Sequence, residues 1–154
     1  MGLLLVLNVH GSINSPAAVR QALGELKVSK KFTASVVSDD PATQGMLRLC
    51  KEYVTWSPVD LPLLSRLLKE RGMVSSARRL DAKALKELGY GSYDSLAERM
   101  LKEGLRLTAL EGVLPYLRLA PPKGGFRRSL RRQASDGGLL GSNPGLPEIV
   151  GRMV

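Results

Sequence analysis

The sequence predicts an α+β fold in which a small β-sheet is covered by helices. Over residues 1–60, short apolar runs alternate with amphipathic segments in the order β-α-β-α-β. Residues 61–112 carry helical patterns only, and residues 113–154 hold one further strand and a segment rich in glycine and arginine. We therefore expect three parts: a core over 1–60, a helical insertion over 61–112, and a C-terminal extension over 113–154 that contains a strand, a basic loop and a closing helix.

The first strand is expected at Leu3–Val9, a nearly continuous apolar run that ends before Gly11. Ser15 followed by Pro16 is typical of a helix start. The helix that follows should bury one apolar stripe, formed by Val19, Ala22, Leu23 and Leu26. The alternating residues Phe32–Val37 predict the second strand.

Asp39-Asp40-Pro41 predicts the start of a second helix. We expect its inner face to consist of Met46, Leu49, Cys50 and Tyr53. The β-prone Val54-Thr55-Trp56 follows and should stop at Ser57-Pro58. Trp56 is interpreted as a core residue, and Cys50 as a small apolar filler on the helix face.

Three helices are expected in the insertion. Each should begin at a residue whose side-chain oxygen can accept a backbone N–H, and each should end at a glycine. The expected starts are Asp60, Asp81 and either Ser92 or Ser95, and the expected ends are Gly72, Gly89 and Gly104. Ser95 with Glu98 would form a capping box.

The C-terminal extension opens with a strand candidate at Tyr116–Leu119, ended by Pro121-Pro122. From there to about residue 147 the composition predicts a loop or a disordered segment, because glycine, proline, serine and arginine bury little apolar surface. Within it, Gly137-Gly138-Leu139-Leu140-Gly141 is interpreted as a flexible loop. Pro147–Val154 is expected to form a closing helix.

Charge is the most unusual property of the chain. Lys and Arg outnumber Asp and Glu by 23 to 14, which leaves a net charge of +9. Residues 118–154 carry seven basic and two acidic side chains, so the excess is densest in the C-terminal quarter. Such an excess favours a polyanionic partner, either nucleic acid or an anionic membrane surface.

The strongest candidate site is the segment 123–132, which we call the basic segment. Arginine forks match phosphate oxygens, and glycines let the backbone approach a ligand closely. We expect RNA contacts from its Lys123, Gly124, Gly125, Arg127, Arg128, Arg131 and Arg132, while Phe126 could stack on a base or anchor the loop. Lys30, Lys31 and Arg48 are secondary candidates, equally compatible with a solubilising surface.

The sequence contains no catalytic constellation. His10 is the single histidine and Cys50 the single cysteine, so neither a metal site nor a nucleophilic triad has its usual set of residues. We expect no enzyme activity, cofactor, metal or small-molecule substrate. The lone cysteine and the absence of a long apolar span favour a cytoplasmic protein without a membrane partner.

Several pieces, in this order and spacing, resemble the large-subunit ribosomal protein L-thirty family in its longer archaeal and eukaryotic form. They cover nearly the whole chain and are Gly45-Met46-Leu47, Tyr53-Val54-Thr55-Trp56, Leu68-Lys69-Glu70-Arg71-Gly72, Leu117-Arg118-Leu119, Pro121-Pro122-Lys123-Gly124-Gly125-Phe126, Gly137-Gly138 and Ile149-Val150-Gly151-Arg152-Met153. The resemblance implies a ferredoxin-like βαβαβ core with a helical insertion. It also implies a constituent of the large ribosomal subunit, with large-subunit ribosomal RNA and neighbouring ribosomal proteins as partners. Lys123 and the glycines beside it would then lie in an RNA-facing loop.

The sequence departs from the family pattern in three regions. Asn8 and His10 stand where the family often has arginine, while Ser57 and Ser142-Asn143-Pro144 alter the pattern near the third strand and after Gly141. Two other functions remain open. One is an RNA-binding accessory protein outside the ribosome, and the other is a small-molecule regulatory domain on the same βαβαβ pattern.

Overall fold

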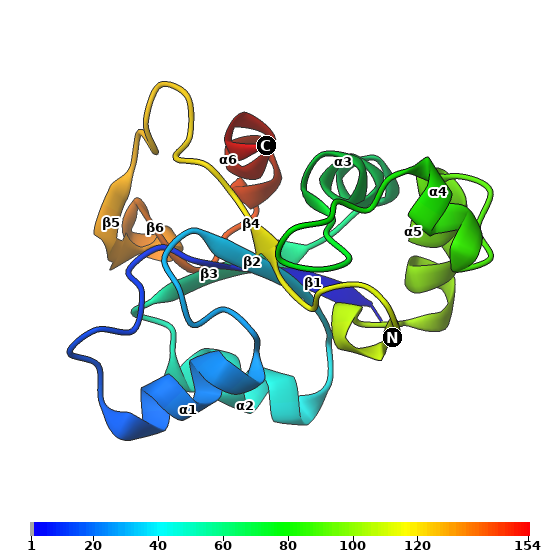
Figure 1. Cartoon of the computed structure of the whole chain (residues 1–154). Coiled ribbons are helices and arrows are strands. Elements are labelled where there is room, and N and C mark those ends of the chain that lie inside the picture. Colours follow the sequence, from blue (N-terminus) through cyan, green and yellow to red (C-terminus); the bar gives the residue numbers. More distant parts are fainter. Residues whose placement is uncertain (1) are drawn as a thin grey trace.

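The computed structural model describes residues 2–154, which form a six-stranded sheet with helices on both faces (Figure 1). The strand order is β4-β2-β1-β3-β6-β5. The strands are β1 (Leu3–Asn8), β2 (Thr33–Ser38), β3 (Val54–Pro58), β4 (Leu117–Arg118), β5 (Ser129–Gln133) and β6 (Gly138–Ser142). The helices are α1 (Ala17–Glu25), α2 (Pro41–Leu49), α3 (Leu61–Arg71), α4 (Ala82–Glu87), α5 (Tyr93–Glu103) and α6 (Leu146–Met153), with short 3₁₀ turns η1 (Leu107–Ala109) and η2 (Ala134–Asp136). The predicted α+β class with a ferredoxin-like core is confirmed.

Strand β1 lies at the centre and is buried along its whole length. It pairs antiparallel with β2 on one side and β3 on the other, so that Val6 lies opposite both Ser35 and Trp56. Successive side chains of a strand point to opposite faces. Leu4 and Val6 therefore enter the core under α1 and α2, while the other leucines of β1 enter the core under the remaining helices. The apolar run predicted as the first strand is thus covered on both faces.

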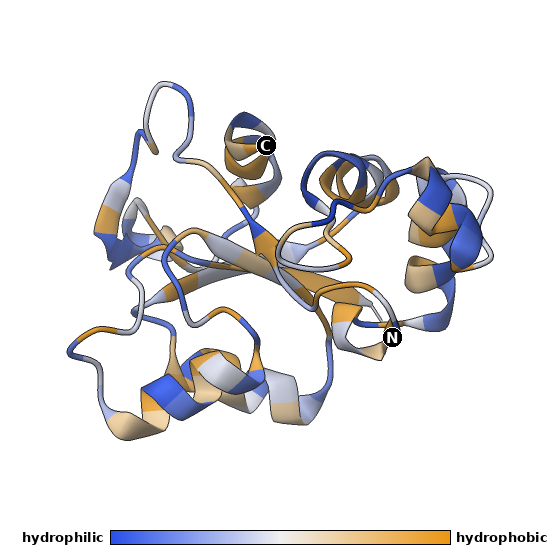
Figure 2. Cartoon of the chain, in the orientation of Figure 1, coloured by the Kyte–Doolittle hydropathy of each residue, from blue (hydrophilic) through white to orange (hydrophobic). Residues whose placement is uncertain are grey.

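Helices α1 and α2 cover one face of the sheet, and α3 and α6 cover the other, with α5 packed against α3 (Figure 1). Figure 2 shows the apolar sides of these helices turned towards the sheet. The expected caps form at Asp60, Asp81 and Ser92, which accept the backbone N–H groups of Leu63 at 3.1 Å, Ala84 at 2.8 Å and Ser95 at 3.1 Å. The helix at Ser92 begins there and not at Ser95, so the alternative capping box does not start it.

Two local predictions on the first helices were wrong. Ser15 does not cap α1, because its hydroxyl donates to the carbonyl of Ser12 at 2.6 Å and Pro16 occupies the cap position. On the predicted inner face of α2, Cys50 is buried and the partly buried Met46 and Tyr53 pack on the same core, but Leu49 is 51% exposed. Packing under the sheet buries Leu47, with Thr43, in place of Leu49. The Cys50 thiol is buried as expected, which raises its pKa to about 11.

The largest correction concerns residues 121–147, which were predicted to form a loop. Strand β6 pairs in parallel with β3, with Thr55 opposite Gly141, and Leu139 and Leu140 are buried in the core. Strand β5 adds to the outer edge of β6. A Cβ at Gly138 would overlap the Arg132 carbonyl, and Gly141 has φ +79° with the Gln133 side chain against it. These glycines let the two strands approach closely. In the sequence, glycines with this role cannot be told from glycines of a loop.

Trp56 is expected to be a stability residue. Its side chain is 9% exposed and packs in the core under α1 and α2. Trp56→Ala should lower the free energy of unfolding by about 3–5 kcal/mol, as large aromatic truncations in a core do. Denaturant titration measures this, with the exposed Leu49→Ala as a control that should change stability by less than about 0.5 kcal/mol. Equal, small effects of both substitutions would contradict the assignment of Trp56 to the core.

Candidate nucleic-acid interface

Basic side chains gather at the end of the sheet where β1 ends and β2 and β3 begin. Backbone hydrogen bonds join these segments: Phe32 donates to the Asn8 carbonyl at 2.7 Å, and Leu119 donates to the Phe32 carbonyl at 3.0 Å. We call this surface the basic end; it comprises residues 8–12, 27–33, 48–53 and 116–133. It lies on the left in Figure 1, away from α4 and α5.

The loop after β1 is organised by Asn8, which is fully buried. Its Oδ1 accepts the backbone N–H groups of His10 at 3.0 Å and Gly11 at 2.8 Å. Its Nδ2 donates to the Val28 carbonyl at 2.6 Å. Asn8 is therefore a structural residue that joins the loop after β1 to the turn before β2. His10 is exposed, and its Nε2 lies against the Leu130 carbonyl of β5.

The first half of the basic segment is anchored at both of its ends. Arg152 of α6 donates from Nη1 to the carbonyls of Lys123 at 2.9 Å and Gly125 at 2.5 Å. The ring of Phe126 packs 5.8 Å from that of Phe32, so this phenylalanine anchors the loop. The side chains of Lys123, Arg127 and Arg128 remain exposed. We call residues 123–128 the basic loop. The basic loop is held by its backbone and one ring, which leaves its cations in solvent.

The other predicted residues lie around this loop. Arg131 and Arg132 share a hollow of about 670 Å³ with His10 and Lys51. Arg48 and Lys51 line a second hollow of about 310 Å³, beside Gln133, whose Nε2 donates to the Lys51 carbonyl at 3.1 Å.

Lys30 and Lys31 are exposed in the turn before β2. The Lys31 Nζ lies 5.1 Å from the centroid of the Phe32 ring, on which the basic loop packs. The fold therefore brings the secondary candidates Lys30, Lys31 and Arg48 to the same surface as the basic segment.

The charges of this surface are poorly compensated within the protein. In residues 2–154 the ion pairs are Arg78–Glu87 at 3.6 Å and Arg99–Glu103 at 3.4 Å, both in the helical insertion. None of the predicted lysines and arginines takes part in an ion pair in this part of the chain. Glu52 and Asp136 line the hollow that holds Arg131, and Glu148 lies near Arg127 and Arg128. The basic end nevertheless keeps a large excess of positive charge, because eleven Lys and Arg stand against one acid, Glu52, within its residues. Such an excess is expected for a surface that meets a polyanion.

Known proteins resemble this chain along most of its length. A profile described as "Ribosomal protein L30p/L7e" matches residues 4–54. The "Large ribosomal subunit protein uL30" of Thermofilum pendens is 38% identical over 142 residues, which is 92% of this chain and 91% of that protein. Proteins of the same description from Korarchaeum cryptofilum and Ignicoccus hospitalis are 35% and 31% identical over 90% and 99% of this chain, and over 86% and 98% of their own length. The chain belongs to the ribosomal protein L30p/L7e family.

The family assignment covers more of the chain than the profile does. The profile match ends in β3, whereas the archaeal relatives align with the helical insertion and the C-terminal extension as well. The resemblance inferred from the sequence is confirmed, and the family consists of structural, non-enzymatic proteins. In this L30p/L7e member, no group of three His, Cys, Asp or Glu side chains in residues 2–154 is placed to bind a metal. No helix in the same range combines the length and apolarity needed to cross a membrane.

Sequence reasoning missed part of the basic end. Lys27, Tyr116 and Arg118 line a hollow of about 320 Å³ beside Lys30. Tyr116 and Arg118 are two residues apart at a strand, a spacing that places both on one face and could have revealed them. Conversely, the adjacent basic residues Arg78 and Arg79 lie in the insertion, away from the basic end. There Arg78 pairs with Glu87, and Arg79 donates to the Glu70 carbonyl at 2.6 Å.

Arg152 is expected to hold the basic loop in place. Arg152→Met keeps the apolar stem of the side chain but removes the donors to the carbonyls of Lys123 and Gly125. Amide hydrogen exchange over residues 121–128 should become faster, and the free energy of unfolding should fall by about 1 kcal/mol. Exchange measured by mass spectrometry gives the first quantity.

Arg79→Met is the matched control, because it removes a guanidinium-to-carbonyl bond in the helical insertion. It should leave exchange over 121–128 unchanged. If Arg152→Met also leaves that exchange unchanged, the loop is held by other contacts.

Proposed function

We propose that this chain is a structural constituent of the large ribosomal subunit and binds large-subunit ribosomal RNA through its basic end. Family membership supports the first part, since the archaeal relatives are described as large-subunit proteins. The observation that carries the second part is the basic loop. Its backbone is tied to Arg152, while Lys123, Arg127 and Arg128 stay exposed and outside any ion pair in residues 2–154.

The proposed binding chemistry is electrostatic and needs no cofactor. Guanidinium groups donate two parallel hydrogen bonds to phosphate oxygens, and each phosphate neutralised releases condensed counterions. Gly124 and Gly125 are exposed and carry no side chain, so the RNA backbone can approach the loop closely. Arg131, Arg132, Lys30, Lys31 and Arg48 extend the same contact surface across the sheet end.

The proposed partners are ribosomal RNA and neighbouring ribosomal proteins. Helices α4 and α5 of the helical insertion lie on the side of the molecule opposite the basic loop (Figure 1). With the basic end on RNA, the insertion is free to contact adjacent proteins of the particle. A cytoplasmic location on the ribosome follows from this proposal.

Substitution of Arg127→Gln together with Arg128→Gln should weaken RNA binding and flatten its salt dependence. Two phosphate contacts are lost, so the log–log slope of affinity against salt should fall by about two units for a duplex, or somewhat less for single strands. Thermal stability should change little, because both side chains are exposed. The measurement is a salt titration of binding to a large-subunit RNA fragment.

The matched control is Arg78→Gln with Arg79→Gln, another adjacent arginine pair, placed in the helical insertion. Its slope should equal that of the wild type. Identical slopes for all three proteins would show that Arg127 and Arg128 face solvent in the complex, and the RNA contact would have to be sought elsewhere.

Co-sedimentation separates a ribosomal constituent from an RNA-binding accessory protein. In a sucrose gradient of native extract at moderate salt, the chain should travel with large subunits in stoichiometric amount. An accessory protein would be substoichiometric, or would travel with precursor particles only. The second pattern would contradict the ribosomal part of the proposal while leaving RNA binding intact.

A further inference from the structure

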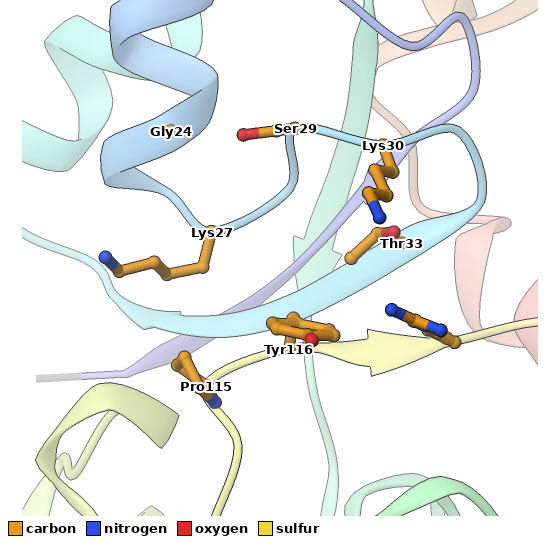
Figure 3. A pocket seen from close by; sticks show the side chains of 8 residues that line it. Gly24, Lys27, Ser29, Lys30, Thr33, Pro115 and Tyr116 are labelled. Carbon is orange, nitrogen blue, oxygen red and sulfur yellow. The ribbon is translucent and has the colours of Figure 1, made fainter. Parts of the chain in front are cut away.

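A hollow of about 320 Å³ opens between the end of α1, the start of β2 and strand β4 (Figure 3). Lys27, Lys30 and Arg118 lie around it, and the half-buried ring of Tyr116 forms one wall. The hydroxyl-bearing Ser29 and Thr33 line it as well. Its volume is at the lower end of the range of about 300–1,000 Å³ that small-molecule pockets occupy. It is therefore large enough for one small planar ligand.

The charges around this hollow all have the same sign. Among the described residues that line it, three are cations and none is acidic. The Arg118 guanidinium lies 5.7 Å from the centroid of the Tyr116 ring. A similar pair exists in the insertion, where Arg99 lies 5.5 Å from the Tyr90 ring, but there Glu103 neutralises the arginine at 3.4 Å. The pair at the hollow is thus an aromatic ring and a cation without an acidic partner in residues 2–154.

Lys27 is placed at the rim of the hollow by the turn that ends α1. Lys27 follows the end of α1 and has φ +64°, in the left-handed region that glycine usually occupies at this position. The turn is closed by backbone hydrogen bonds, since Lys27 donates to the Gly24 carbonyl at 3.1 Å and Val28 donates to the Leu23 carbonyl at 3.0 Å. The lysine side chain is exposed and makes no ion pair within residues 2–154, so its ammonium is available to a ligand at the hollow.

We propose that this hollow binds a single unpaired nucleotide of RNA. The base stacks on Tyr116, and the flanking phosphates are held by Lys27, Lys30 and Arg118. A base paired within a duplex presents no free face to a ring recessed in a pocket, whereas an unpaired base can be stacked on an aromatic side chain. The inference rests on the proposed RNA-binding function and specifies what part of the RNA this surface recognises.

The test compares two RNAs. One is a short, adenine-rich, single-stranded oligoribonucleotide, and the other is an RNA hairpin with the shortest loop that still lets the stem form. Fluorescence anisotropy at low salt gives both affinities. Tyr116→Leu should weaken single-strand binding about ten-fold and leave hairpin binding unchanged, whereas Tyr116→Phe should retain wild-type affinity for both. Tyr90→Leu is the matched control and should change neither affinity. Thermal melts of all variants establish that each is folded.

Lys27→Gly provides a second variant, chosen because glycine suits the backbone at this position. Glycine adopts the observed φ without strain, so the thermal midpoint should not fall. The salt dependence of single-strand binding should nevertheless lose about 0.7 of a unit of log–log slope, because one phosphate contact is removed. An unchanged slope would show that Lys27 does not contact the RNA.

The outcomes separate this inference from the proposed function. Wild-type binding by Tyr116→Leu, or equal losses for single strand and hairpin, overturns the nucleotide pocket. If the Arg127/Arg128 double substitution still flattens the salt dependence, RNA binding by the basic end survives that result. If neither substitution affects binding, both proposals fall. Binding of free adenosine monophosphate and inorganic phosphate with equal strength would show a site for anions alone and would also overturn the stacking role of Tyr116.

Discussion

The burial of β1 on both faces is the constraint on which the rest of this structure depends. A strand whose side chains are apolar on both sides needs cover above and below it, and a hydrogen-bonded strand on each side to satisfy its backbone groups. Strands β2 and β3 supply those neighbours. Because both run opposite to β1, the end of β1 coincides with the starts of β2 and β3. The basic end lies where these three strand ends meet.

Ordering an arginine-rich loop requires contacts that do not use its charges. The loop at 123–128 solves this with its backbone, since Arg152 donates to two of its carbonyls and Phe126 packs on Phe32. The cost of ordering each residue, about 1–2 kcal/mol in backbone entropy, is therefore met partly by contacts within the protein. Arg152 is the one basic residue of the extension, residues 113–154, that is partly buried. Its Nε is buried without a hydrogen-bond partner among residues 2–154.

Much of the fold could be predicted because its signals are local. The apolar run of β1, the capping aspartates Asp60 and Asp81, and the glycine that ends α5 act through neighbouring residues. Other features are not local, so the sequence pattern misled. Leu49 and Leu47 both fit a helical stripe, and the choice between them depends on which side of α2 faces the sheet. The sequence pattern did not reveal β6. Gly138 and Gly141 of β6 leave room for Arg132 and Gln133 of β5, and the charged sequence of β5 resembles a loop.

The candidate site divides in the same way. The sequence by itself determined the α+β class, the family, and the identity of the basic segment, because composition, periodicity and motif order are properties of the chain alone. Only the tertiary structure decided that Lys30, Lys31 and Arg48 lie with this segment, that Arg78 and Arg79 do not, and that Tyr116 and Arg118 share a hollow with Lys27. The physical reason is distance along the chain: these groupings join residues as far apart as Lys30 and Arg118, and pairing of β2 with β4 is what brings them together.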